Sequence, residues 1–196
     1  MFFPLLAALW VACIAAAQPT AAQDHKPALH GRLPSASAPA ASPYAGMEKR
    51  SVKALSEQQI ADLRAGRGMG LALAAELNGY PGPLHVLEFA QALQLSDAQR
   101  MRTEELMVNM KAETITIGEQ VIAGETALDR LFAERHITQA SLWETISRIG
   151  MAQAELRSAH LRYHLAVVAI LSSAQITEYA ILRGYAQRED YGHKSR

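Results

Sequence analysis

Two histidines four residues apart, His160 and His164, are the side chains of this 196-residue chain whose types and spacing best suit shared chemistry. Residues at i and i+4 lie on one face of a helix, so both imidazole rings can reach a single ion. Imidazole nitrogen is a good ligand for zinc, nickel, copper and cobalt. Because two ligands do not complete a metal site, Glu155, His85, Met69 or a residue of a second subunit would have to supply the others.

The same pair of histidines also has a purely structural interpretation. His160 falls in the apolar seam of its helix, where a histidine can be packed and hydrogen-bonded, with His164 beside it at the rim. The spacing is compatible with both interpretations, so packing and metal binding remain alternatives at this point.

Three methionines, Met101, Met107 and Met110, form a second and softer group. Thioethers bind Cu(I), and the spacing of Met107 and Met110 places two sulfur atoms on one helical face. Methionine is also the flexible residue of cores and of adaptable binding surfaces. Because no longer methionine run supports copper, we favour packing or contact with a bound protein.

Motifs typical of enzymes are missing from the chain. It has no nucleophile elbow, phosphate loop, dinucleotide fingerprint or zinc-protease motif, and we expect a protein that is not an enzyme. No cofactor is required on this interpretation, and Zn, Ni or Cu would be optional ligands. Acidic and basic side chains balance at 19 each, so the excess positive charge of a nucleic-acid-binding protein is not present.

Helical periodicity runs through the chain from Leu55 onward, and no segment alternates like a strand. The predicted fold class is all-α, a long antiparallel helical hairpin with short flanking helices. The long helices are expected over residues 96–135 and 138–170, with Gly124 bending or splitting the first. Capping boxes at Ser56 and Ser172 and a proline at position 83 predict the starts of shorter helices.

The second long helix has an apolar seam that alternates steps of four and three, which predicts a shallow coiled-coil crossing with the first. Its members are Leu142, Ile146, Ile149, Gln153, Leu156, His160, Tyr163, Val167 and Ile170. A single hairpin is thin and leaves other apolar side chains in need of cover, so we expect a homodimer. These side chains are Met101, Met107, Ile115, Ile122 and Phe132.

The chain opens with an apolar run over residues 2–17 that is followed by small residues, a pattern typical of a secretory signal peptide. The predicted organisation is a cleaved signal peptide over 1–22, a flexible linker rich in Pro, Ala and Ser over 23–54, a helical domain over 55–186 and a polar tail over 187–196. An uncleaved membrane anchor is the alternative, because no Lys or Arg precedes the run. The single cysteine, Cys13, lies in this run, so cleavage leaves no thiol, which suits an oxidising compartment.

Two short stretches on either side of the predicted hairpin match each other. They are Leu95-Ser96-Asp97-Ala98-Gln99 and Leu171-Ser172-Ser173-Ala174-Gln175. Each is a capping box, in which the serine accepts from the amide three residues on and the glutamine reaches back to the serine amide. Behind an export signal, the pair resembles the repeated Leu-Thr-x-x-Gln motif of the Spy/CpxP family of periplasmic proteins, with Ser in place of Thr.

The resemblance implies an ATP-independent periplasmic chaperone or envelope-stress protein that binds unfolded envelope proteins and forms a cradle-shaped antiparallel dimer. Met101, Met107, Ile115, Ile122 and Phe132 are then the candidate client-binding side chains. The family also includes zinc- or nickel-responsive proteins that bind metal through helix-borne histidines. The alternative function is therefore a heavy-metal (Zn, Ni or Cu) sensor or resistance protein that uses His160 and His164, with an envelope-stress or metal-signalling membrane protein as its partner.

Overall fold

The computed structural model describes residues 42–187, and every regular element in that range is helical, so the all-α prediction is confirmed. The predicted signal peptide, Cys13, most of the predicted linker and most of the polar tail lie outside the described residues. Within residues 42–187, none of the helices combines the length and the apolar character needed to cross a membrane. The elements are η1 Met47–Lys49, α1 Glu57–Arg64, α2 Leu73–Glu76, α3 Pro83–Glu88, α4 Asp97–Ala133, α5 Gln139–Val168 and α6 Ser173–Leu182.

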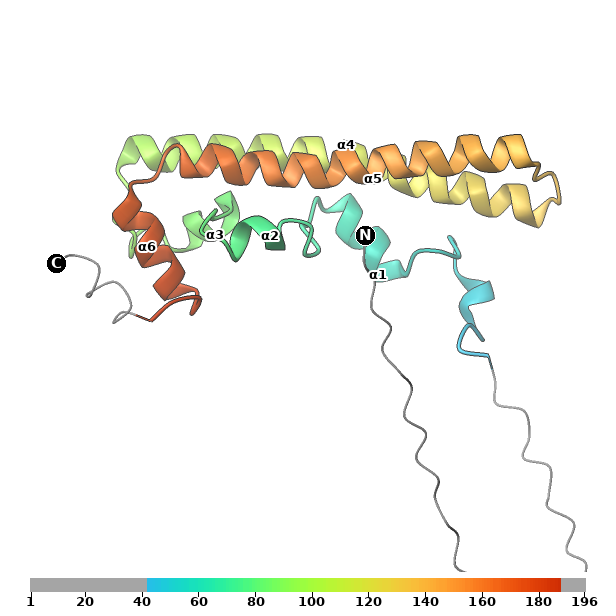
Figure 1. Cartoon of the computed structure of the whole chain (residues 1–196), viewed down its shortest axis with the longest axis horizontal. Coiled ribbons are helices and arrows are strands. Elements are labelled where there is room, and N and C mark those ends of the chain that lie inside the picture. Colours follow the sequence, from blue (N-terminus) through green and yellow to red (C-terminus); the bar gives the residue numbers. More distant parts are fainter. Residues whose placement is uncertain (1–41, 188–196) are drawn as a thin grey trace, which may run out of the picture. The chain divides into compact units, whose positions relative to one another are not determined.

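Helices α4 and α5 dominate this unit and pack along each other in opposite directions (Figure 1). Ser96 caps α4 and Thr138 caps α5, and each cap forms a complete capping box. Between them the chain turns through Arg135, whose positive φ of 57° ends the helical path. The caps therefore set both starting points of the long pair.

Helix α4 is continuous through its glycines, so of the two expected effects of Gly124, bending or splitting, the split does not occur. A Cβ atom at Gly124 would lie 2.7 Å from Cγ1 of Ile149 on α5, and one at Gly118 would lie 2.8 Å from the carbonyl oxygen of Leu63 on α1. Both distances are too short for a side chain. The two glycines therefore let neighbouring helices approach α4 closely.

The seam of α5 differs in part from the predicted one. Ile149, Leu156, His160 and Val167 are buried as expected, whereas Gln153 is exposed and Ile146 is 44% exposed. Small residues occupy the corresponding places in the seam. The buried positions that alternate steps of four and three are Thr145, Ile149, Ala152, Leu156 and Ala159.

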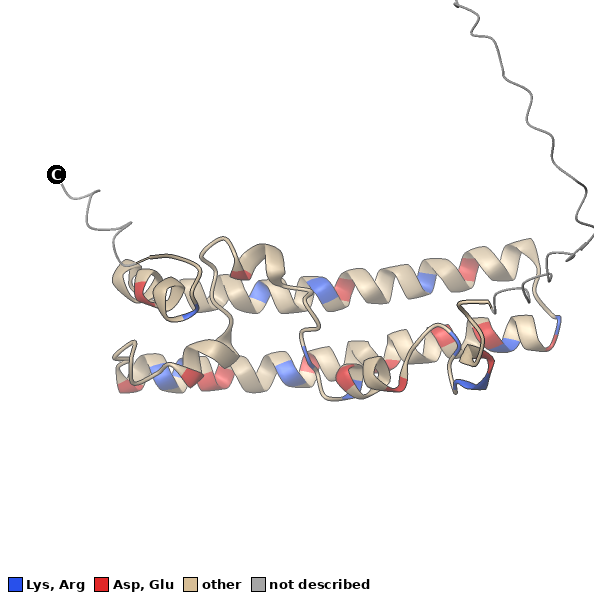
Figure 2. Cartoon of the chain, turned by 90° about the horizontal axis from the view of Figure 1, so that it is seen from below, with Lys and Arg blue, Asp and Glu red and all other residues tan. Residues whose placement is uncertain are grey.

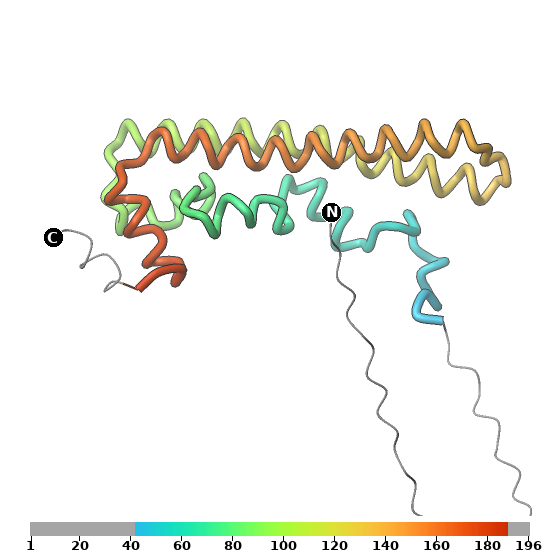
Figure 3. Tube along the Cα trace, viewed as in Figure 1, coloured from blue at the N-terminus to red at the C-terminus, as the bar shows by residue number. Residues whose placement is uncertain are grey.

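The short elements cover one side of the α4–α5 pair, and α6 turns back from its end (Figure 3). Helix α1 buries Ile60 and Leu63 against α4, in a cluster that also contains Val52. Val52 is 5% exposed, so the predicted flexible linker is wrong at its C-terminal end. Helix α3 begins with proline and buries Val86, which joins a second cluster with Val167 and Tyr179.

Candidate functional site

Both predicted capping boxes form at the helix starts where the sequence places them. Ser96 Oγ accepts from the Gln99 amide at 3.2 Å, and Gln99 Oε1 accepts from the Ser96 amide at 3.0 Å. Ser172 and Gln175 repeat the arrangement with distances of 3.2 and 2.9 Å. Of the two motif leucines, Leu171 is buried in the second cluster and Leu95 packs against it. The motif residues thus cap α4 and α6.

The two motif glutamines also bind each other, which the sequence does not predict. Gln99 Nε2 donates to Gln175 Oε1 at 2.9 Å, and Gln175 Nε2 donates to Gln99 Oε1 at 3.0 Å. Each amide nitrogen also donates to a backbone carbonyl, that of Ile170 from Gln99 and that of Leu93 from Gln175. Both side-chain amides therefore use all of their hydrogen-bonding groups. The paired glutamines join the N-terminus of α4 to the N-terminus of α6.

His160 and His164 lie together in the wall of a cavity of about 570 Å³ between the short elements and the long pair. Both are buried, with exposed fractions of 3% and 8%. His164 Nδ1 lies 2.6 Å from the carbonyl oxygen of Tyr80, and because that oxygen can only accept, Nδ1 carries the hydrogen. The ring also rests on Gly82, where a Cβ atom would lie 2.8 Å from His164 Nε2. Contacts to the segment before α3 therefore fix the orientation of His164.

His160 is less well satisfied than its neighbour. Its Nε2 atom is buried and has no hydrogen-bond partner. Burial lowers the pKa of His160, and the nearby His164 lowers it further. A neutral imidazole with a partnerless nitrogen is the form that binds metal, and it is equally able to bond a polar ligand.

A buried carboxylate, Glu76 of α2, completes the polar wall of the cavity. Its Oε1 atom accepts hydrogen bonds from the hydroxyls of Tyr179 and Tyr185 and forms an ion pair with Arg183 at 3.3 Å. Its Oε2 atom has no hydrogen-bond partner and lies 3.9 Å from His164 Nδ1. Burial and the bond to Glu76 raise the pKa of Tyr179. Sequence reasoning missed Glu76, although it is the one charged residue in an otherwise uncharged stretch over residues 68–84.

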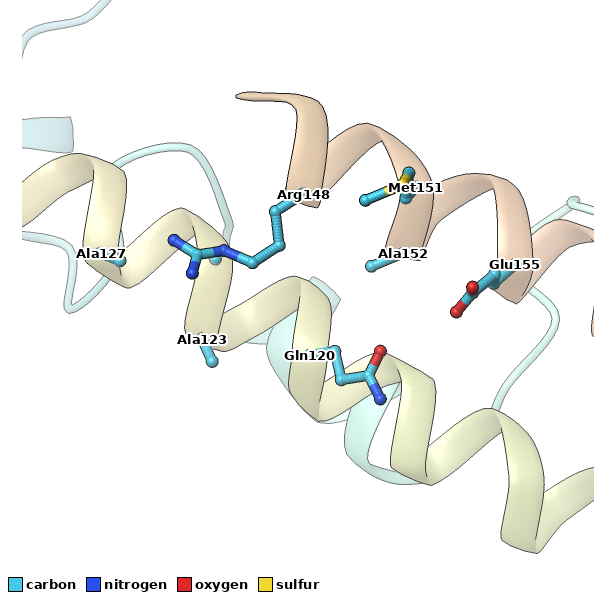
Figure 4. A pocket seen from close by; sticks show the side chains of 8 residues that line it. Gln120, Ala123, Ala127, Arg148, Met151, Ala152 and Glu155 are labelled. Carbon is cyan, nitrogen blue, oxygen red and sulfur yellow. The ribbon is translucent and has the colours of Figure 1, made fainter. Parts of the chain in front are cut away.

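The residues proposed to complete a metal site fall in different places. His85 and Met69 line the same cavity as the two histidines, although His85 Nδ1 is engaged by Glu88 at 2.8 Å. Glu155 instead projects into a separate groove between α4 and α5, across from Gln120 (Figure 4). No cluster of three or more His, Cys, Asp or Glu suited to a metal ion occurs within residues 42–187. Glu155 and the two histidines therefore line different hollows.

The predicted client-binding side chains do not share one surface. Met101 and Phe132 are 65% and 55% exposed, while Met107 and Ile115 are half-buried. Ile122 is 7% exposed because it belongs to the cluster beneath α1, so its assignment to a client surface is wrong. Met107 lines the histidine cavity together with Met110.

The link between α2 and α6 leads to a prediction about stability. Replacing Tyr179 with phenylalanine should lower the free energy of unfolding by about 1–2 kcal/mol, because buried Glu76 loses a donor while the ring contact with Phe89 is kept. Tyr185→Phe is the matched control, since its hydroxyl binds the same oxygen but the side chain is 40% exposed. Urea unfolding of both variants measures the difference. Equal losses would show that the burial of the Tyr179 hydroxyl does not matter.

Comparison of the chain with protein-family models, with curated proteins and with solved structures gives no significant match.

Proposed function

We propose that this protein is an ATP-independent periplasmic chaperone or envelope-stress protein of the Spy/CpxP type. The observation that supports it most is the exposure of several large apolar side chains, each more than half exposed, on two long charged helices. Met101, Val108, Phe132 and Trp143 are among them. Charged positions of both signs alternate along the same helices (Figure 2). The paired capping boxes at Ser96 and Ser172 support the family resemblance.

The mixture of groups suggests how such a protein would work. Exposed pairs such as Arg100 with Glu104 and Arg162 with Glu113 create a surface of both signs that attracts the charged parts of an unfolded chain. Nearby apolar side chains hold the client weakly. Release follows as the client folds and buries its own apolar surface. ATP hydrolysis has no part in this cycle, since the sequence contains no nucleotide-binding motif. On this proposal two copies form a homodimer that covers part of the exposed apolar surface.

The chaperone function is tested by the aggregation of an unfolded client in the presence of equimolar mature protein. The wild type should slow aggregation. The double variant Met101→Ser, Phe132→Ser should slow it at least about three-fold less, because two apolar contacts are lost. Asn109→Ser with Ala133→Ser is the control, since both positions are exposed on α4 but offer no large apolar group. A wild type that leaves aggregation unchanged would exclude this function.

A second function, heavy-metal sensing or resistance, is favoured by a specific observation. Two buried polar atoms without partners, His160 Nε2 and Glu76 Oε2, belong to the wall of one cavity. Each such atom costs about 1–3 kcal/mol when unsatisfied, and imidazole nitrogen and carboxylate oxygen are both ligands of Zn, Ni or Cu. Met107 and Met110 in the same wall offer thioethers to copper.

Calorimetric titration with Zn, Ni and Cu ions tests the metal function on tag-free mature protein stripped with a chelator. Micromolar or tighter binding should disappear in the variant His160→Ala, His164→Ala. The control is His136→Ala, which removes an exposed histidine at the turn between α4 and α5. Binding that survives the double substitution would contradict a site built on this pair.

A further inference from the structure

The groove that Glu155 enters is lined by small side chains. Its volume is about 370 Å³, and all of the described residues that line it belong to α4 and α5. They include the buried Gly124 and Ala152 and the more exposed Ala123 and Ala127 (Figure 4). Small residues on both helices leave room for a side chain of another molecule. Within residues 42–187, none of the short elements fills this space.

Two charged side chains of α5, Arg148 and Glu155, lie at opposite ends of the groove, with Met151 between them (Figure 4). Both charged residues are exposed, and neither side chain makes an ion pair or a hydrogen bond within the described part of the chain. Seven residues of helix separate them by about 10 Å, so they do not pair with each other. Met151 is 63% exposed. The groove side of α5 therefore carries a positive, an apolar and a negative side chain in that order.

This order is complementary to itself when the helix is reversed. If a second copy of α5 lies antiparallel to the first, Arg148 of each copy faces Glu155 of the other, and the two-fold axis passes near Met151. Met151 of each copy then lies over the small residues of the other. A parallel arrangement would instead place Arg148 against Arg148, and such a contact between like charges is unfavourable.

We infer that Arg148, Met151 and Glu155 form a self-complementary surface that binds the same surface of a second copy of this chain. Two ion pairs between Arg148 and Glu155 flank the two methionines, which enter the small-residue groove. The inference rests on the homodimer that the proposed function includes, and it specifies the face and the orientation of the contact. It does not depend on the binding of clients.

The charges select a second copy over an unfolded client as the occupant of the groove. An unfolded chain holds no fixed charges two helical turns apart, so it gains little from Arg148 and Glu155 at this spacing. A second α5 presents the opposite charge at each position. Each copy also gives and receives the same contacts, which is the property of a closed two-fold interface.

Sedimentation velocity of the mature protein tests the inference by measuring the dissociation constant of the dimer. Arg148→Glu should weaken the dimer at least about ten-fold, because two like-charged pairs replace two ion pairs. Glu155→Arg should act in the same way, and it serves in place of Arg148→Glu if that variant does not fold. The double exchange Arg148→Glu with Glu155→Arg should restore the constant to within about three-fold of the wild type, because both ion pairs form again with reversed sign.

Arg157→Glu is the matched control. Arg157 is exposed on α5 and does not line the groove, and its replacement changes the net charge by the same amount as Arg148→Glu. It should alter the dissociation constant less than about two-fold, since an exposed charge outside the contact is screened by salt. Circular dichroism of each variant checks that its helix content equals that of the wild type.

Other outcomes overturn the interface or separate it from the chaperone function. A double exchange that stays as weak as Arg148→Glu contradicts the antiparallel contact. A wild type that is monomeric but still slows client aggregation removes the interface and leaves the chaperone function. A wild type that dimerises as described but does not slow aggregation removes the chaperone function and leaves the interface. Weaker suppression of aggregation by Arg148→Glu at unchanged self-association assigns the groove to clients.

Discussion

Replacing Gln99 with alanine should lower the free energy of unfolding by about 3 kcal/mol, several times the usual effect of a capping glutamine. The substitution removes the bond to the Ser96 amide, the donation to the Ile170 carbonyl and both bonds to Gln175. The carbonyl and the Gln175 amide then lose partners in a part-buried place, where an unmade bond is costly. Urea unfolding followed by circular dichroism measures the loss.

Gln59 supplies the matched control for this experiment. It occupies the same position in the capping box of α1, with its Oε1 atom 2.8 Å from the Ser56 amide, but it makes no contact with a second capping box. Gln59→Ala should therefore cost only about 0.5–1 kcal/mol, the value of a cap alone. Similar losses at Gln59 and Gln99 would contradict the role that we assign to the paired glutamines.

Glutamate at the same positions separates the cap from the cross-link. A carboxylate can accept from the serine amide and is favoured near a helix N-terminus, so Gln59→Glu should be neutral or slightly stabilising. Gln99→Glu should destabilise at least as much as Gln99→Ala, because the carboxylate cannot donate and would face Gln175 Oε1 and the Ile170 carbonyl. This difference explains physically why both motif copies carry glutamine where a simple capping box also accepts glutamate.

The capping boxes mark the limit of what this sequence reveals. Each box is a local pattern within four residues, and for that reason the starts of α1, α4, α5 and α6 are predictable. The bond between Gln99 and Gln175 joins positions far apart in sequence and depends on where α6 turns back. No local pattern contains that information.

Burial was harder to predict than helix position, for two physical reasons. The seam uses Thr145 and Ala152 where the regular heptad spacing places Ile146 and Gln153, because small residues let two long helices approach. Ile122 looks like exposed apolar surface on α4 until α1 covers it. Glu76 was missed for the opposite reason, since an acidic residue in a short turn is expected to be solvated.

Close approach of helices also underlies the second large effect, at Gly118. Gly118→Ala should lower the free energy of unfolding by about 1–2 kcal/mol, even though alanine is the better helix former by about 1 kcal/mol. The new Cβ would lie 2.8 Å from the Leu63 carbonyl oxygen and 3.3 Å from Leu63 Cβ. The oxygen belongs to the backbone of α1 and cannot rotate away, so α1 must move off α4 and loosen the packing of Leu63.

Gly150 provides the control with the same chemical change, in the middle of α5. A Cβ atom there would meet nothing within 4 Å, so Gly150→Ala should raise the free energy of unfolding by about 0.5–1 kcal/mol through helix propensity alone. The two substitutions should thus act with opposite signs. Urea unfolding of both variants gives the comparison, and stabilisation by Gly118→Ala would show that α1 is not held at the distance described. In that case the packing of Leu63 against Gly118 would also lose its basis.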